Sequence, residues 1–160
     1  MNILFVCTGN TCRSSMAEGI FREMLKKINN ENIHVSSSGL STYEGEWANE
    51  KAIDVLKKKN IDISSHRAKQ LDYDIISASD LILTMTSAHK NILEHSVPEA
   101  TNKIYTLKEY AYLINNEKSN GNNLDIADPY GMDYNVYEQI MREIETELQK
   151  IINNINKLNI

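Results

Sequence analysis

Short apolar segments alternate with amphipathic segments along the chain, and this alternation restricts the fold more than any other feature of the sequence. The segments that predict strands are residues 2–6 (NILFV), 33–37, 80–85 (DLILTM) and 103–106. The segments that predict helices are residues 16–28, 48–59, 87–95, 107–114 and 134–158. Because strands that alternate with helices form parallel sheets, we expect an α/β fold with helices on both faces of the sheet.

The predicted helix at residues 16–28 has sequence signals at both ends. Ser14 or Ser15 can cap its first turn, and Glu18 follows Ser15 at the spacing of a capping box. Asn29 and Asn30 mark its end. Farther along the chain, residues 118–123 are polar and rich in Gly and Asn, so we expect a loop there.

Length and composition predict one domain over residues 1–160. The 160 residues correspond to about one typical domain, and no repeat or linker divides them. No apolar run is long enough to span a bilayer, and the N-terminus lacks the basic and apolar regions of a secretory signal. A net charge of −5 disfavours binding to nucleic-acid phosphates. We therefore expect a cytoplasmic monomer with no membrane or nucleic-acid partner.

The segment between the first strand and the first helix predicts a phosphate-binding loop. It contains Cys7-Thr8-Gly9-Asn10-Thr11-Cys12-Arg13-Ser14, a C-x5-R-S pattern at the carboxyl end of a strand, where ligands bind in open α/β sheets. The five residues between Cys7 and Arg13 are enough to curl the backbone around one tetrahedral oxyanion. Inward N–H groups and the positive end of the helix would then bind that anion, and Gly9 permits a conformation that a β-carbon would oppose.

Two side chains of this loop predict chemistry on a bound phosphoryl group. The helix N-terminus and Arg13 favour the thiolate form of Cys7, so we expect a nucleophile at neutral pH. Arg13 can contact two phosphate oxygens at once, which a lysine cannot do. Together they predict in-line attack on phosphorus and a phospho-cysteine intermediate. Asp128, which is followed by Pro129, is the candidate acid for the leaving group and the candidate base for the hydrolytic water.

These motifs resemble the low-molecular-weight protein tyrosine phosphatase family. The resemblance extends over nearly the whole chain and is carried by the C-x5-R-S loop, Met16-Ala17-Glu18, Ser37-Ser38-Gly39, His66-Arg67-Ala68 and Asp128-Pro129. It implies a three-layer sandwich in which helices cover both faces of a four-stranded parallel sheet, the Rossmann-like phosphatase fold. It also implies catalysis without a metal and without an organic cofactor.

The resemblance further implies a role for each matching residue. Cys7 corresponds to the nucleophile, Arg13 to the phosphate clamp, and Asp128 to the acid and base. Ser14 corresponds to the hydroxyl that hydrogen-bonds the thiolate, and Asn10 to the residue that holds the strained shape of the loop. The expected phosphate-binding set is Thr8, Gly9, Asn10, Thr11, Cys12, Arg13 and Ser14.

Within that family, the chain is most similar to the bacterial protein arginine phosphatases. Thr11 stands where tyrosine-directed members usually carry a bulky aliphatic residue, and Gly131 follows Tyr130 where they commonly have a second aromatic residue. Met85-Thr86 and Thr106-Leu107-Lys108-Glu109-Tyr110 also resemble this branch. Ser15 replaces the proline that the family commonly has, so we expect a looser first helical turn.

The chemistry of phosphoarginine fits these residues. A guanidinium group is planar and polar, and burying it without acceptors costs free energy. The Thr11 hydroxyl can hydrogen-bond the attacking water or the P–N leaving group, and Asp128 can pair with the guanidinium. Tyr130 can stack on the guanidinium plane. Tyr43, together with Trp47, either forms a wall of the pocket or merely covers the loop.

We therefore expect a phosphatase that hydrolyses phosphoarginine on protein substrates through a phospho-cysteine. A protein tyrosine phosphatase of the same family is the alternative. A thiol-linked arsenate reductase would need an external thiol, because no cysteine follows Cys12. A phosphoprotein-binding module without catalysis would need neither Cys7 as a nucleophile nor Asp128 as an acid.

Several other polar residues have a structural and a functional interpretation. Cys12 either packs in the core or forms a reversible disulfide with Cys7 that protects the thiolate from over-oxidation. His66 is either a catalytic base or, as we expect, a hydrogen-bonded structural residue behind the loop. The residues expected at the surface are His34, His89 and His95, with Asp125 and Asp133 expected to be solvated.

Overall fold

The computed structural model describes residues 1–119, 121 and 123–158. The strands among these residues are β1 (Asn2–Cys7), β2 (His34–Gly39), β3 (Leu81–Thr84) and β4 (Ile104–Thr106), and they form one parallel sheet in the order β2-β1-β3-β4. The helices are α1 (Arg13–Lys27), α2 (Glu50–Lys57), α3 (Tyr73–Ala78), α4 (Ser87–Ser96), α5 (Leu107–Ile114) and α6 (Tyr134–Asn153). Two 3₁₀ helices span Pro98–Lys103 and Ile155–Lys157.

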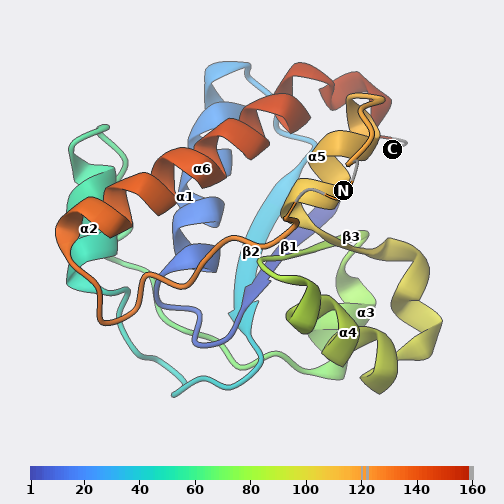
Figure 1. Cartoon of the computed structure of the whole chain (residues 1–160), viewed down its shortest axis with the longest axis horizontal. Coiled ribbons are helices and arrows are strands. Elements are labelled where there is room, and N and C mark those ends of the chain that lie inside the picture. Colours follow the sequence, from blue (N-terminus) through green and yellow to red (C-terminus); the bar gives the residue numbers. More distant parts are fainter. Residues whose placement is uncertain (120, 122, 159–160) are drawn as a thin grey trace.

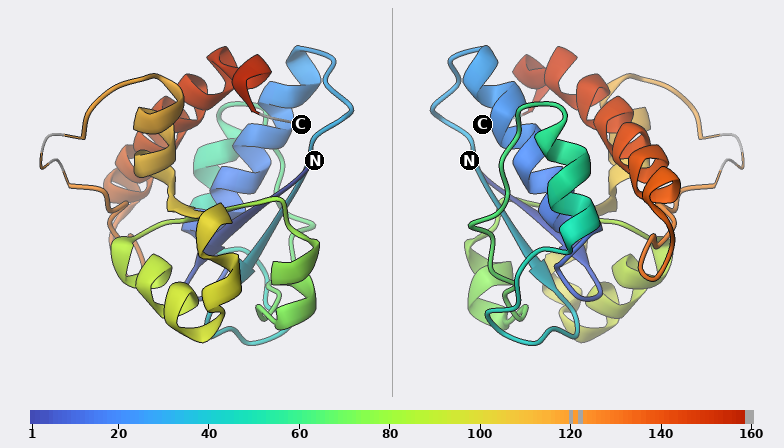
Figure 2. Two further views of the ribbon diagram at one scale, coloured as in Figure 1. Left: turned by 90° about the vertical axis from the view of Figure 1, so that its right-hand side faces the viewer. Right: turned by 90° about the vertical axis from the view of Figure 1, so that its left-hand side faces the viewer.

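The helices form two layers, one on each face of the sheet (Figure 1). Helices α1, α2, α5 and α6 share one face, and α3 and α4 lie on the other, as the side views in Figure 2 show. The expected three-layer α/β sandwich with a four-stranded parallel sheet is confirmed.

The side chains of β1 alternate between two hydrophobic cores. Ile3 and Phe5 pack into the core that α1 and α6 cover, whereas Leu4 and Val6 pack into the smaller core beside α3 and α4. All four side chains are fully buried. Successive residues of a strand face opposite sides of the sheet, and here both sides are dry, which explains the uninterrupted apolar run.

The strand order places the carboxyl end of β1 at a natural binding position. From β1 the chain continues to β2 on one side, and it later returns to β3 on the other side of β1. Loops diverge where the winding of a parallel sheet reverses in this way, and they leave a crevice between them. Residues 8–12, between β1 and α1, and residues 85–86, between β3 and α4, lie at this position.

The N-terminus of α1 differs from the predicted capping box. Cys12 is the N-cap residue, and no side chain caps the helix. The Ser14 hydroxyl turns inward to the loop, and the Ser15 hydroxyl donates to the Cys12 carbonyl at 2.9 Å. Glu18 accepts a hydrogen bond from Ser37 of β2 instead of a backbone N–H. The predicted capping box is wrong because Ser15 bonds to a preceding carbonyl, while Ser14 and Glu18 make contacts outside the helix.

Other boundaries also differ from the prediction. The sequence reasoning missed α3, although Asp72 caps it by accepting from the N–H of Ile75 at 2.8 Å, and it missed the 3₁₀ helix Pro98–Lys103. Helix α6 ends at Asn153, before the predicted end at residue 158. In the predicted loop 118–123, residues 120 and 122 lie outside the described residues. Among the residues that the structure describes, no helix has the length and apolarity needed to cross a membrane.

Candidate active site

The loop after β1 is held in an unusual backbone conformation at Asn10. The φ angle of Asn10 is 57°, in the left-handed region, which asparagine tolerates better than most residues. Gly9 is not in that region, and a Cβ there would meet only the Thr11 hydroxyl oxygen, at 3.8 Å. The expectation that the loop needs a glycine at position 9 is therefore wrong for this conformation. Gly39 is the tighter position, since a Cβ there would lie 2.5 Å from the carbonyl oxygen of Thr8.

Every polar group of Asn10 has a partner, and this compensates for the unfavourable φ. Its side-chain N–H groups donate to the hydroxyls of Ser14 and Ser37, both at 2.8 Å. Its side-chain oxygen accepts from the N–H of Lys69 at 2.9 Å, and its backbone carbonyl accepts from Nε2 of His66 at 2.7 Å. Asn10 is completely buried, so these bonds are shielded from water. The geometry fits the expected role of Asn10 in holding the shape of the loop.

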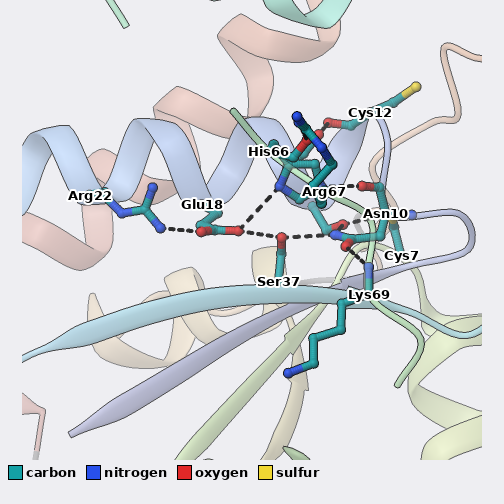
Figure 3. Close-up of polar contacts among 11 residues, drawn as sticks. Cys7, Asn10, Cys12, Glu18, Arg22, Ser37, His66, Arg67 and Lys69 are labelled. Carbon is teal, nitrogen blue, oxygen red and sulfur yellow. Dashed lines mark hydrogen bonds and ion pairs between the residues drawn. The ribbon is translucent and has the colours of Figure 1, made fainter. Parts of the chain in front are cut away.

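The Asn10 bonds continue into a polar network that reaches the surface of α1 (Figure 3). The Ser37 hydroxyl donates to Glu18 at 2.5 Å, and Glu18 pairs with the exposed Arg22 one turn along the helix. Nδ1 of His66 lies 3.9 Å from the same carboxylate. His66 is thus a hydrogen-bonded residue behind the loop, as expected, and it does not line the cavity described below.

The Cys7 thiol receives hydrogen bonds from within the loop. Its Sγ lies 2.9 Å from Ser14 Oγ and accepts from the backbone N–H of Asn10 at 3.3 Å. Because Asn10 already donates to Ser14 Oγ, the Ser14 proton is available for the sulfur. Two donors are therefore directed at the sulfur that the sequence predicts to be the nucleophile.

Arg13 has a buried N–H group without a partner in the part of the chain that the structure describes. Its side chain is 5% exposed, and Nη1 donates to the carbonyl of Ile126 at 3.0 Å. Nη2 pairs with Oδ2 of Asp128 at 3.2 Å, and the Asp128 side chain is 52% exposed. The buried Nε of Arg13 has no hydrogen-bond partner among the described residues. A buried guanidinium N–H without a partner is costly, and an anion in the loop would satisfy it.

These groups share one cavity of about 240 Å³. Its lining residues come from the loop, from residues 41–46 and from the Asp128 segment: Cys7, Thr8, Gly9, Thr11, Cys12, Arg13, Ser41, Thr42, Tyr43, Glu46, Asp128 and Tyr130. Asn10 and Ser14 do not line it, because their side chains brace the loop from behind. Sequence reasoning did not identify Ser41, Thr42 or Glu46, whose positions depend on the course of the chain after β2.

Two tyrosines stand at the mouth of the cavity. Tyr43 is 84% exposed and Tyr130 is 72% exposed, and both line the opening. Trp47 does not line it and instead packs against the guanidinium of Arg67. Of the two aromatic residues considered for one wall, only Tyr43 is therefore in a position to contact a ligand.

The second cysteine of the loop, Cys12, is buried. Both Cys7 and Cys12 are free thiols. Sγ of Cys12 lies 3.3 Å from the hydroxyl of Tyr137 of α6, and burial raises the pKa of the Cys12 thiol. Tyr137 fills the space between α6 and the loop, so Cys12 has a packing role, and its disulfide with Cys7 stays a prediction.

His89 is buried and Asp125 is only partly exposed, whereas both were expected from the sequence to face solvent. His89 is buried at the first turn of α4, where its Nε2 lies 2.9 Å from the hydroxyl of Thr8. Burial, with a smaller contribution from Arg13, lowers the pKa of His89 to about 4, so the imidazole is neutral at pH 7. Asp125 is half-buried and accepts from the N–H of Ser87 at 2.7 Å, whereas Asp133 is exposed and caps α6. Sequence reasoning did not foresee the positions of His89 and Asp125, because their contacts with Thr8 and with Ser87 join residues that are distant in sequence.

The fold and the loop agree with a comparison against protein families. Residues 2–159 match the model for the low molecular weight phosphotyrosine protein phosphatases, and the chain belongs to this family. Within the described residues, no group of three or more His, Cys, Asp or Glu side chains is arranged to hold a metal ion.

This chain is similar to both arginine and tyrosine phosphatases of the family. The protein-arginine-phosphatase of Bacillus subtilis (strain 168) is 33% identical, with 98% of each chain covered. A solved structure of a mutant of the arginine phosphatase YwlE, with a phosphorylated active-site serine, has a TM-score of 0.89 at 32% identity and covers 99% of this chain and 98% of that one. A low molecular weight protein tyrosine phosphatase from T. tengcongensis has a TM-score of 0.86 at 42% identity and covers 96% and 98%.

Proposed function

We propose that this protein is a protein arginine phosphatase that works through a phospho-cysteine intermediate. The observation that carries the proposal is the cavity around the loop. It joins the Cys7 thiol, the unpartnered Nε of Arg13 and the Asp128 carboxylate, and Thr11 adds a small polar side chain to its wall. A binding module would need neither the thiol nor the carboxylate. The relatives named as arginine phosphatases support the choice of substrate.

In the first step, the Cys7 thiolate attacks phosphorus. The S–P bond forms as the P–N bond of phosphoarginine breaks, and Asp128 gives its proton to the departing nitrogen. The backbone N–H groups of the loop and Arg13 stabilise the charge on the phosphoryl oxygens. The Asp128 carboxyl group lies next to the phosphate-binding group, with 3.2 Å between its Oδ2 and Nη2 of Arg13, and Asp128 acts in the first step in its protonated form.

In the second step, water hydrolyses the intermediate. Asp128 takes a proton from the water while the water oxygen bonds to phosphorus, and the S–P bond breaks. The products are inorganic phosphate and the Cys7 thiolate, which the Ser14 hydroxyl and the Asn10 N–H stabilise again. Arginine released in the first step carries a full positive charge, so carboxylates near the opening favour its formation.

The walls of the cavity support phosphoarginine over phosphotyrosine. A phosphorylated guanidine needs hydrogen-bond acceptors around its nitrogens, because burying them unpaired costs free energy. Thr11, Glu46 and Asp128 supply oxygen atoms in this cavity. Tyr43 and Tyr130 could stack on either a guanidine plane or a tyrosine ring. These two exposed aromatics are the observation that favours the tyrosine phosphatase as the second candidate.

The two candidates separate in one comparison of rates. Two peptides with the same flanking residues, one with phosphoarginine and one with phosphotyrosine, are hydrolysed by the wild-type protein, and kcat/KM is measured for each. We expect about a 10-fold or greater preference for phosphoarginine, because the polar wall rejects an apolar ring. A preference for the phosphotyrosine peptide would establish the tyrosine candidate instead.

Replacing Thr11 with isoleucine is expected to shift this preference towards phosphotyrosine. Thr11→Ile removes a hydroxyl from the cavity wall and adds apolar surface that suits an aromatic ring. We expect the ratio of kcat/KM for phosphoarginine over phosphotyrosine to fall by about 10-fold. Thr101→Ile, the same substitution at an exposed position of the 3₁₀ helix Pro98–Lys103, is the matched control and should leave the ratio unchanged. An unchanged ratio in Thr11→Ile would show that Thr11 does not select the substrate.

A further inference from the structure

We propose that Asp125 and His89 are positioning residues that attach the two halves of the active site to one support, the first turn of α4. The phosphate loop follows β1, and the segment that carries Asp128 arrives more than a hundred residues later, so nothing in the local sequence sets their separation. The inference rests on the function proposed above for Cys7, Arg13 and Asp128. It adds two residues that touch neither the cavity nor the reacting atoms.

The Asp128 segment is attached to the start of α4 at two adjacent points. The carboxylate of Asp125 accepts from the N–H of Ser87 at 2.7 Å. The N–H of Ile126 donates to the carbonyl of Met85, at the end of β3, at 2.8 Å, and Ile126 is fully buried. The Ile126 carbonyl in turn accepts from Nη1 of Arg13. Residues 125 and 126 are thus bound to both the α4 junction and the phosphate clamp.

The bond from Asp125 satisfies a specific need of α4. The first N–H groups of a helix have no acceptor within the helix. The hydroxyl of Thr86, the N-cap residue, accepts from the N–H of His89 at 3.1 Å, which leaves Ser87 to an acceptor from outside. An anionic carboxylate at the positive end of a helix forms a strong hydrogen bond of this kind.

The phosphate loop is attached to the same turn through His89. Nε2 of His89 lies 2.9 Å from the hydroxyl of Thr8, the residue that follows the nucleophile. Arg13 is the nearby cation, and Asp125 and Asp128 are the nearby carboxylates that act on His89 electrostatically. A neutral imidazole at this place supports Thr8 without adding a charge that would compete with Arg13 for the substrate or for Asp128.

The acid depends on this support because its own side chain has little. Asp128 is half-exposed, and its carboxylate contacts only Arg13 and the N–H of Tyr130 among the described residues. Its position is therefore set by the backbone of residues 125–129, which Asp125 and Ile126 hold. A displacement of about 1 Å of a reacting group can cost about 100-fold in rate.

The test separates the acid step from the rest of the reaction. Asp125→Ala is compared with wild type on aryl phosphates whose leaving groups range from p-nitrophenol to phenol. We expect kcat/KM, which reports the steps up to formation of the phospho-cysteine, to fall by about 100-fold for phenyl phosphate and by less than about 3-fold for p-nitrophenyl phosphate, whose leaving group needs no acid. Inhibition by inorganic phosphate should stay the same. Asp125→Asn keeps an acceptor oxygen for Ser87, so most of the rate on phenyl phosphate should be retained.

The control is Asp72→Ala, which removes an aspartate that caps another short helix, α3, away from the cavity. Asp72→Ala should lower the unfolding temperature about as much as Asp125→Ala does. Its rates on the aryl phosphates should show the same dependence on the leaving group as those of wild type. Equal losses on all aryl phosphates in Asp125→Ala, or none, would overturn the role of Asp125. A wild-type protein that hydrolyses no phosphate ester would refute the proposed function itself, which is a different result.

His89 is tested on the other half of the site. His89→Ala should weaken inhibition by inorganic phosphate about 10-fold and slow all aryl phosphates alike, because Thr8 belongs to the phosphate loop. His89→Gln can still hydrogen-bond the Thr8 hydroxyl and should recover most of the phosphate affinity. Phosphate affinity that is unchanged in His89→Ala would overturn the role of His89.

Discussion

The Cys7→Ser variant is expected to lose turnover almost completely and to keep its affinity for phosphate. The sulfur is the atom that bonds to phosphorus, and a serine hydroxyl in the same place is a far weaker nucleophile at neutral pH. We expect kcat to fall by about 10⁴-fold or more on every substrate. The loop N–H groups and Arg13 bind the anion without the sulfur. The affinity of the variant for inorganic phosphate should therefore not decrease.

Phosphate affinity can be measured directly in this inactive variant by isothermal titration with inorganic phosphate. The same measurement serves as the control for folding, because a loop that had collapsed would bind no anion. The unfolding temperature of the variant should also rise with phosphate concentration, as binding to the folded state requires. Turnover equal to that of wild type would exclude a phospho-cysteine intermediate.

The Asp128→Asn variant is expected to show the second largest effect, concentrated on poor leaving groups. An asparagine side chain cannot give a proton to the departing group and cannot take one from water. We expect a loss of about 10²- to 10³-fold in kcat on phenyl phosphate and on phosphoarginine peptides. The first step on p-nitrophenyl phosphate should be much less affected, because p-nitrophenolate leaves without a proton.

The measurement is a plot of rate against leaving-group pKa, in which Asp128→Asn should give a steeper dependence than wild type. Burst kinetics with p-nitrophenyl phosphate would show the intermediate accumulating if water activation becomes the slow step. Asp133→Asn is the matched control, since it changes the charge by the same amount on the same segment and retains an acceptor oxygen for the α6 cap. A uniform loss across leaving groups would mean that another residue is the acid.

Much of the fold follows from local sequence. The apolar run at residues 2–6 becomes β1 because its side chains face two cores, and the helical spacing after residue 16 becomes α1. Such periodicities depend only on neighbours in the chain. The errors occur where a tertiary contact competes with a local one. Ser15 and Glu18 have the spacing of a capping box, but Ser15 donates to the Cys12 carbonyl and Glu18 accepts from Ser37 of β2.

Some residues of the candidate site are likewise visible in the local sequence, and others are brought to it only by tertiary packing. The residues at 7–14 act together because they are consecutive, so their motif is visible in the sequence. Asp128 was recognisable through the proline that follows it. His89 was assigned to the surface, and Asp125 was assigned to solvent, because only the packing of α4 brings them to Thr8 and to the Asp128 segment. Glu46 had no local signal at all.

The sequence by itself determined the alternation of strands with helices, the phosphate loop and the thiol at its base, because each depends on spacing along a few consecutive residues. Only the tertiary structure decided how the loop keeps its shape and how the acid reaches it. Asn10 can hold a left-handed conformation because residues from β2 and from positions 66–69 satisfy its polar groups. Asp128 can meet Arg13 because α4 supports both segments, and such contacts between distant residues leave no pattern in one sequence.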